Sequence, residues 1–222
     1  SLKTICQSLF ASCEEKEAPM LVEPLLRAAA EARAEDRFVL VDALCHVPCE
    51  YLPPERLPEL TGWLTAMLGN GSPELDIIAL HELLRLERGC PSVAPRIRSA
   101  AAAYVPHWEE SLPHRWLRAK LCGQSPEALD AQTISHIHLS NLKNAVPWTI
   151  KLTQVNILRE YVLAHPQAAF HTALHFSNLL CVSEHLPVRE AAGNALLRIA
   201  PCLLVDQINE ITIDLTRELE SG

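Results

Sequence analysis

The most regular pattern of apolar and polar positions lies between Pro187 and Pro201. Apolar residues follow Val188 at offsets of three, four, seven and eight, which places them on one stripe of a helix. These positions are Ala191, Ala192, Ala195 and Leu196. Because alanine allows a neighbouring backbone to approach closely, this face is predicted to pack against other helices.

The same periodicity recurs along the whole chain, and prolines and glycines separate its segments. Strand signals are scarce, because alternating runs of β-branched and aromatic residues hardly occur. The pattern predicts an all-α protein of about twelve helices joined by short links. We expect these helices at 2–14, 19–35 with its regular part from Pro24, 36–47, 54–68, 73–87, 93–105, 113–122, 126–143, 147–164, 166–181, 187–200 and 204–219.

Matching positions recur at a period of roughly 38 residues, which approaches the roughly 40–47 residues of HEAT and armadillo units. Val188-Arg189 corresponds to Ile150-Lys151, one period earlier, and to Leu75-Asp76, three periods earlier. Asp36-Arg37 precedes Leu75-Asp76 by one further period, and a weaker match falls near Pro113. The chain is therefore predicted to be built from repeated helical units.

The string Val-Arg-x-x-Ala-x-x-Ala-Leu, from Val188 to Leu196, resembles the second helix of a HEAT repeat. The resemblance implies an α-solenoid, a right-handed superhelix of antiparallel helix pairs in which neighbouring pairs bury each other's apolar faces. It implies one HEAT-like domain over residues 1–222, which we expect to be a part of a larger polypeptide.

Composition agrees with a helical protein that has enough apolar residues for a core. Nearly half of the 222 residues are apolar and only seven are glycine. No apolar run approaches the roughly 20 residues that span a bilayer. Eight cysteines are scattered along the chain, and we expect no signal peptide. We therefore expect reduced thiols and a cytoplasmic protein.

Charge is distributed unevenly along the chain. The net charge of −8 argues against non-specific binding of nucleic acid, which depends on neutralising phosphates. Residues 111–159 nevertheless carry six lysines and arginines against two acidic residues, a local charge of +4. The sequence thus predicts a basic middle that suits an acidic partner segment.

Tryptophans accompany the cations of this basic middle, with Trp108 and His114 near them. In the solenoid, the helices that begin at 113 and 147 are second helices of adjacent pairs, so their side chains would line one concave face. Tryptophan and arginine are enriched where proteins bind partners. The residues predicted to bind a partner are Arg115, Trp116, Arg118, Trp148, Lys151 and Arg189. In the alternative interpretation, Trp116 and Trp148 fill gaps between helices and the cations are ordinary surface.

Three other patterns point to metal chemistry, and each has a simpler interpretation. His171 and His175 are four residues apart on a helix, but two ligands fall short of a site, and a solvated polar face is favoured. Cys45 and Cys49 lack a second cysteine pair, so core packing is favoured for Cys45. His81-Glu82 is similar to the His-Glu pairs of HEAT-type deoxyhypusine hydroxylases, but only one such pair is present. We expect neither a metal nor another cofactor.

No phosphate loop, nucleophile elbow or catalytic triad pattern occurs, so no catalytic residue is predicted. The leading hypothesis is a non-enzymatic scaffold or regulatory domain that binds a protein or peptide through its concave face. The alternative is a HEAT-like nucleic-acid enzyme that resembles the alkylpurine DNA glycosylases. A third hypothesis, a lyase-like chaperone of a bilin, is supported by the repeat alone. The sequence does not predict the oligomeric state.

Overall fold

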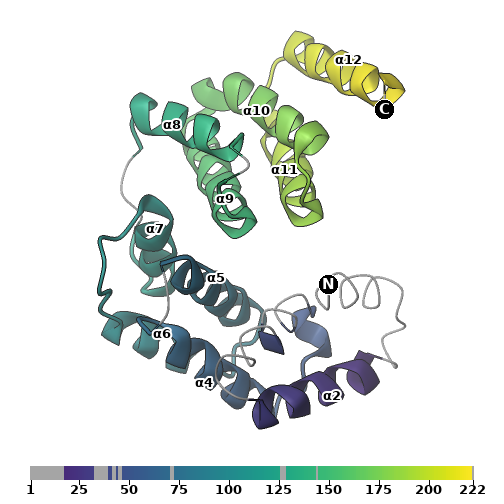
Figure 1. Ribbon diagram of the computed structural model, residues 1–222. Helices are drawn as coiled ribbons and strands as arrows, with labels where there is room; N and C mark the ends of the chain where they lie inside the picture. Colours follow the sequence, from purple (N-terminus) through teal and green to yellow (C-terminus); the bar gives the residue numbers. More distant parts are fainter. Residues whose placement is uncertain are drawn as a thin grey trace. The chain divides into compact units, whose positions relative to one another are not determined.

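The computed structural model describes residues 18–32, 40–41, 44, 47–70, 73–125, 129–143 and 145–221. In these residues the chain forms ten α-helices, three short 3₁₀ turns and no strand (Figure 1). The all-α prediction is confirmed. The helices predicted at 2–14 and over most of 36–47 lie outside the described residues. None of the described helices is both long and apolar enough to cross a membrane.

The chain divides into two compact units, Ser1–Pro126 and Glu127–Gly222. The described elements of unit 1 are α2 (Ala18–Glu31), η1 (Cys49–Tyr51), α4 (Leu57–Met67), α5 (Pro73–Gly89), α6 (Ala94–Ala103) and α7 (Leu112–Leu121). Those of unit 2 are α8 (Ala131–Asn141), α9 (Trp148–Ala164), η2 (Pro166–Ala168), α10 (Ala169–Val182), α11 (Leu186–Ile199), η3 (Ala200–Cys202) and α12 (Val205–Ser221).

Helix α5 is the centre of unit 1, where it packs against α4, α6 and α7. Its apolar side chains at Ile77, Leu80 and Leu83 are almost completely buried, as are Leu64 of α4 and Leu117 of α7. Full burial of one such side chain contributes about 1.5–3 kcal/mol. The leucine-rich periodicity of these segments therefore forms the core, as the sequence predicted.

A buried carboxylate joins three helices of unit 1. Asp76 of α5 is completely buried and accepts hydrogen bonds from the backbone N–H of Gly69 at 3.0 and 3.2 Å. It also accepts one from the hydroxyl of Tyr104, which ends α6. Gly69, just after α4, has a φ of +77°, the left-handed conformation predicted for a glycine that ends a helix. Asp76 thus holds the ends of α4 and α6 against α5.

The segment 47–52 packs against the C-terminal end of α5. Arg85 donates from Nη1 to the carbonyl oxygen of Val47 at 2.7 Å and to Sγ of Cys49 at 3.2 Å. Gly89 lies so close to Cys49 that an added Cβ would be 2.6 Å from its Sγ and 2.8 Å from its Cβ. This contact requires a residue without a side chain at position 89.

Gly89→Ala is therefore expected to lower the free energy of unfolding by about 1–3 kcal/mol, the usual cost of overpacking. Gly62→Ala in α4 is the matched control, since its Cβ would meet only the flexible end of Arg96, at 3.4 Å. The control is expected to change stability by less than about 1 kcal/mol, and in the stabilising direction. Urea denaturation of both variants measures the difference. Equal stabilities would contradict the proposed clash.

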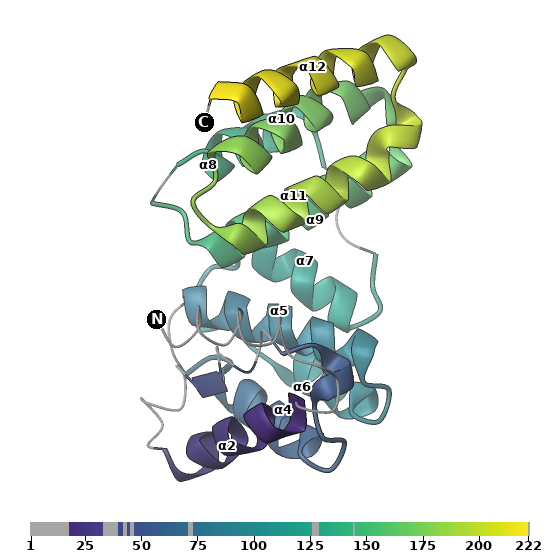
Figure 2. The ribbon, with the colours of Figure 1, turned by 90° about the vertical axis from the view of Figure 1, so that its right-hand side faces the viewer.

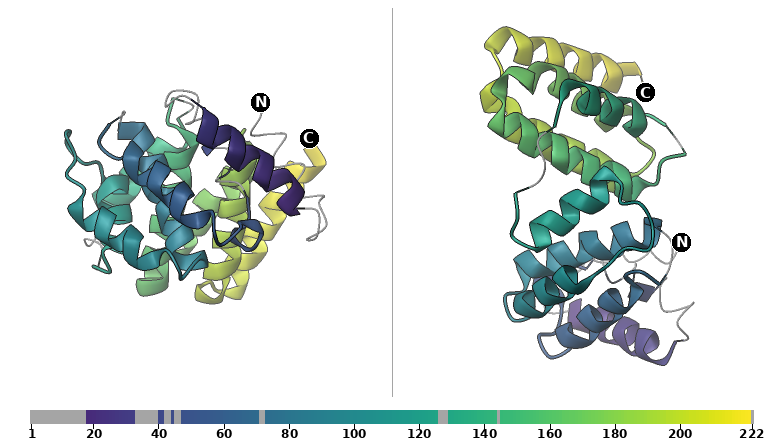
Figure 3. Two further views of the ribbon diagram at one scale, coloured as in Figure 1. Left: turned by 90° about the horizontal axis from the view of Figure 1, so that it is seen from below. Right: turned by 90° about the vertical axis from the view of Figure 1, so that its left-hand side faces the viewer.

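Helix α11 of unit 2 is in extended contact with two neighbours, α9 and α10, and α10 also contacts α12 (Figure 2). In the side view of Figure 3, α12 in yellow covers α10 in green. Val188, Ala192 and Ala195 of α11 are completely buried. The small-residue face predicted from the sequence is therefore a packing face.

Two predicted helix starts differ from the structure. Helix α2 begins at Ala18 and continues through Pro24, although the sequence predicted its regular part from that proline. Val22 and Leu26 on either side of Pro24 are both buried, and their burial offsets the hydrogen bond that proline removes. Helix α8 begins at Ala131 and not near position 126. Its cap is Asp130, whose carboxylate accepts from the N–H of Thr133 at 2.7 Å.

The buried face of α10 does not consist of its apolar residues alone, and Cys181 on the same helix is exposed. The buried residues are Ala169, Thr172, Ala173, His175, Phe176, Ser177 and Leu179. Because α10 contacts α9, α11 and α12, its buried arc is wider than that of a helix with one neighbour, and it includes polar positions.

Candidate functional site

Three of the predicted partner-binding residues, Arg115, Trp116 and Arg118, lie on α7 of unit 1. Trp116 is only 5% exposed, and its ring lies under the ammonium group of Lys120, 5.5 Å from the ring centroid. This burial favours the interpretation in which Trp116 fills a gap between helices. A side chain at this depth stabilises α7 and offers little area to a partner.

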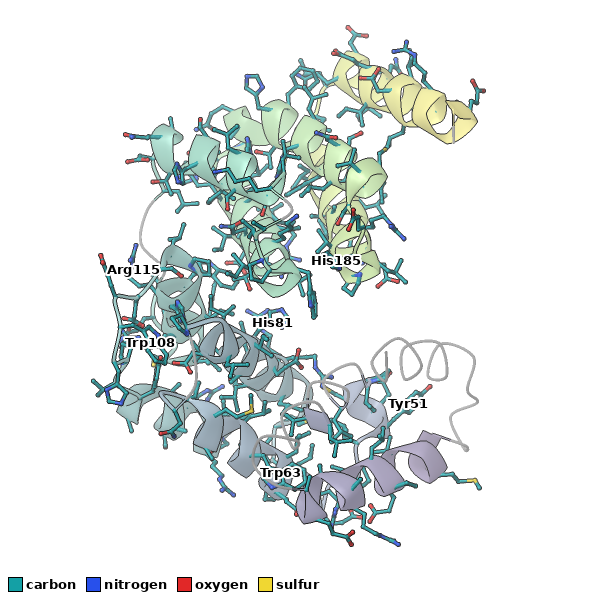
Figure 4. The ribbon with its side chains drawn as sticks, in the orientation of Figure 1. Tyr51, Trp63, His81, Trp108, Arg115 and His185 are labelled. Atoms are coloured by element: carbon teal, nitrogen blue, oxygen red, sulfur yellow. The ribbon has the colours of Figure 1, made fainter. Side chains whose placement is uncertain are left out.

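Arg115 and Arg118 both contact Glu110, just before α7. Arg115 is exposed and donates from Nη1 to the carbonyl oxygen of Glu110 at 2.6 Å. Arg118 forms an ion pair with the carboxylate of the same residue. Figure 4 labels Arg115, which projects from α7, and Trp108 in the segment before it. Glu110 thus positions two of the four predicted cations.

A shallow groove of about 580 Å³ lies beside Arg118, between α6 and the end of α7. It is lined by Arg98, Ser99, Ala101, Ala102, Arg118, Cys122 and Gln124. Small side chains on α6 leave this space open, and Gly123, with a φ of +67°, turns the chain so that Gln124 follows the end of α7. The volume falls in the range of roughly 300–1,000 Å³ that is usual for ligand sites.

The accessible charge of the groove is positive. Arg98 pairs with Glu87, and Arg118 pairs with Glu110. Both glutamate side chains are 12% exposed, whereas those of Arg98 and Arg118 are 58% and 35% exposed. The carboxylates lie beneath the guanidinium groups and hold them toward solvent. Such fixed, forked donors suit carboxylates of a partner.

The other three predicted residues, Trp148, Lys151 and Arg189, belong to unit 2. Lys151 is only 6% exposed, Trp148 is half-buried, and Arg189 donates to the carbonyl oxygen of Ser183 at 2.8 Å. Lys151 lines a hollow of about 40 Å³, far smaller than a usual ligand site. Lys151 and Arg189 therefore contribute to packing within unit 2. That residues of both units line one concave face stays a prediction.

The histidine pair of α10 is split between solvent and core. His171 is exposed, but His175 is 6% exposed, so the predicted solvated face is wrong at this position. The ring of His175 stacks on His138 of α8 with centroids 4.3 Å apart, and its Nε2 accepts from Asn141 at 3.1 Å. Burial, with a smaller effect of His138, lowers the pKa of His175 to about 3. The imidazole is therefore neutral and acts as an acceptor.

The dipeptide His81-Glu82 belongs to an ion-pair cluster of α5. Glu82 lies 2.7 Å from Nε of Arg85 and 3.3 Å from Nδ1 of His81. Burial alone would raise the pKa of Glu82, but the charge of Arg85 and the contacts with His81 prevail and lower it to about 2. Because Arg85 also bonds Val47, the cluster connects α5 to the segment 47–52.

In the described residues, no group of three or more histidine, cysteine, aspartate or glutamate side chains could hold a metal ion. Of the cysteine pair considered for zinc, Cys45 lies outside the described residues. Cys49 is half-buried and has a free thiol beside Arg85 and Gly89.

Comparisons of this chain with protein-family models, with curated proteins and with solved structures give no match.

Sequence reasoning did not find Arg98, Ser99 or Gln124, which form part of the groove lining. Arg98 precedes an alanine-rich run on α6. An exposed arginine followed by small residues is compatible with a groove at that position. The sequence predicts such a groove only if the helix that packs beside α6 is known.

Proposed function

We propose that the chain is a HEAT-like α-solenoid that binds an acidic segment of another protein. The spacing of the described helices supports the repeat. The first helices of successive pairs are α4, α6, α8, α10 and α12, and the second helices are α5, α7, α9 and α11. Within each set, successive helices begin at intervals of roughly 36–39 residues, slightly shorter than the roughly 40–47 residues of most HEAT and armadillo units.

Packing within each unit also supports stacked pairs. In unit 1, α4 contacts α6 and α5 contacts α7. In unit 2, α9 contacts α11 and α10 contacts α12. Stacked helix pairs produce this pattern, because each helix lies beside its counterpart in the next pair as well as beside its own partner. The antiparallel pairing and the right-handed superhelix remain part of the proposal.

The observation that carries the binding proposal is that two solvent-accessible arginines, Arg98 and Arg118, line the groove between α6 and α7. Arg98 and Arg118 are each fixed by a more deeply buried glutamate, so their geometry is set before a ligand arrives. Preorganised cations lose less conformational entropy on binding than mobile ones. The chain as a whole is acidic, so a basic groove on it selects acidic partners and disfavours polyanionic nucleic acid. We propose binding without catalysis, in the cytoplasm or another reducing compartment where the reduced thiols of the described cysteines persist.

The test uses a fluorescein-labelled peptide of alternating glutamate and leucine, titrated with the full chain and followed by fluorescence anisotropy. The double variant Arg98→Gln/Arg118→Gln is expected to bind about tenfold more weakly, since two charge-assisted contacts are lost. The matched control is Arg198→Gln/Arg217→Gln, which removes the same charge from exposed positions of α11 and α12. Its affinity is expected to stay unchanged.

Raising the salt concentration should weaken the wild-type complex, because exposed charges are screened over about 8–10 Å at physiological ionic strength. Equal weakening by both double variants would reduce the effect to net charge and contradict the groove. Failure of the wild-type chain to bind the peptide, or tighter binding to a DNA duplex in the same assay, would contradict an acidic protein partner.

A further inference from the structure

Two free thiols of unit 1, those of Cys49 in η1 and Cys90 just after α5, lie in one local environment. The Sγ of Cys49 is 3.2 Å from Nη1 of Arg85 and 3.9 Å from the carbonyl oxygen of the same residue. The side chain of Cys49 also lies directly against Gly89, the neighbour of Cys90 in the chain. The side chain of Cys49 therefore reaches the chain one residue before Cys90.

The two cysteines differ in access and in charge environment. Cys49 is half-buried with a guanidinium beside its sulfur, whereas Cys90 is 5% exposed. Burial, the charge of Cys49 and a side-chain hydrogen bond with Cys49 raise the pKa of Cys90 to about 11. Cys90 is therefore a neutral thiol at physiological pH. Cys49 is the more accessible of the two thiols, so an oxidant from solvent reaches it first.

We propose that Cys49 and Cys90 form an oxidisable pair that closes to an intramolecular disulfide when the protein meets a hydroperoxide. In the first step, Cys49–SH and H₂O₂ give the sulfenic acid Cys49–SOH and water. In the second, the Cys90 thiol gives up its proton as its sulfur attacks the sulfur of Cys49–SOH, the S–O bond breaks, and the leaving hydroxide takes that proton to form a second water and the disulfide. Peroxide is reduced, and the two thiols are oxidised by two electrons in total.

The disulfide would connect η1 to the end of α5 and close the chain between Cys49 and Cys90 into a loop. Closing a loop of roughly 40 residues restricts the unfolded chain and stabilises the folded one. It would also hold the segment 47–52, which Arg85 already contacts, against α5. The pair lies on elements other than α6 and α7, so its oxidation is separable from peptide binding in the groove.

The experiment treats the full, reduced chain with hydrogen peroxide in small molar excess, blocks the remaining thiols with N-ethylmaleimide and maps peptides by mass spectrometry. The expected product is a Cys49–Cys90 linked peptide that lacks two hydrogen atoms and is separated by dithiothreitol. The exposed thiol of Cys181 and the half-buried thiol of Cys202 are internal controls, which should still react with maleimide.

A second arm identifies the order of the steps. In Cys90→Ser, a dimedone adduct is expected at Cys49, because the sulfenic acid has lost its resolving thiol. In Cys49→Ser, Cys90 should stay unmodified under the same conditions. Linkage of Cys49 to Cys45 or to any other cysteine would overturn the pair, as would oxidation of Cys181 while Cys49 still reacts with maleimide.

Discussion

Replacement of Asp76 by alanine is expected to lower the free energy of unfolding of unit 1 by about 3–4 kcal/mol, because the buried hydroxyl of Tyr104 and the N–H of Gly69 would both lose their acceptor. Each buried polar group without a partner costs about 1–3 kcal/mol.

Urea denaturation followed by tryptophan fluorescence measures this effect, since Trp63, Trp108 and Trp116 lie in unit 1 and report on its transition. Tyr104→Phe should lower the free energy of unfolding by less, about 1 kcal/mol, because Asp76 still accepts the hydrogen bond from the N–H of Gly69. The double variant Asp76→Ala/Tyr104→Phe should have nearly the same stability as Asp76→Ala alone, since the two side chains share one interaction.

Asp214→Ala on α12, which removes a half-exposed carboxylate of unit 2, should change stability by less than about 0.5 kcal/mol. Equal effects of Asp76→Ala and Asp214→Ala would contradict the structural role of Asp76.

Between pH 7 and pH 5, the free energy of unfolding of unit 2 is expected to fall by about 2 kcal/mol. The pKa of His175 is about 3 in the folded chain, whereas an unfolded histidine has a pKa of about 6.5. Below pH 6.5 the unfolded state therefore binds a proton that the folded state does not, and stability is lost progressively as the pH falls toward 3. Burial also lowers the pKa of His138, which acts in the same direction.

The comparison that isolates this effect is His175→Gln, which cannot titrate. Its unfolding free energy should change much less between pH 7 and pH 5 than that of the wild-type chain, whatever its absolute stability. His185→Gln, at an exposed position, should keep the wild-type pH dependence. The lowered pKa of Glu82, about 2, affects stability only below about pH 4.5, where its unfolded form begins to bind a proton. A wild-type slope retained in His175→Gln would show that another group is responsible.

Helix positions were largely predictable because they depend on local signals. Prolines, glycines and the 3.6-residue period predicted α4, α5, α6, α7, α9, α10, α11 and α12 close to their observed bounds. The start of α8 was not predicted correctly, because Ser125-Pro126 and Asp130 are both suitable N-terminal caps and the sequence alone does not show which of them is used. For α2 the regular part was predicted to begin at Pro24, but the helix begins earlier, because burial of the residues around Pro24 outweighs the helix-breaking effect of the proline.

The candidate site was predicted less well than the helices. Cations near α7 were found, but Trp116 and Lys151 proved to be buried, because residue type does not tell which side of a helix faces a second neighbour. Arg98 was not predicted because Arg118, which lines the same groove, is on another helix. A groove is a property of two helices together, and a periodic pattern describes one helix at a time.

The sequence by itself determined the helical class, the lengths of most helices and the small-residue face of α11, since each depends on residues within a few turns of one another. Only the tertiary structure decided that Asp76, a polar residue inside an apolar pattern, joins three helix ends. It alone decided that His175 is a neutral core residue, and that the side chain of Cys49 lies against Gly89. The physical reason is that burial and hydrogen bonding depend on partners tens of residues away, whereas helix formation depends on neighbours in the chain.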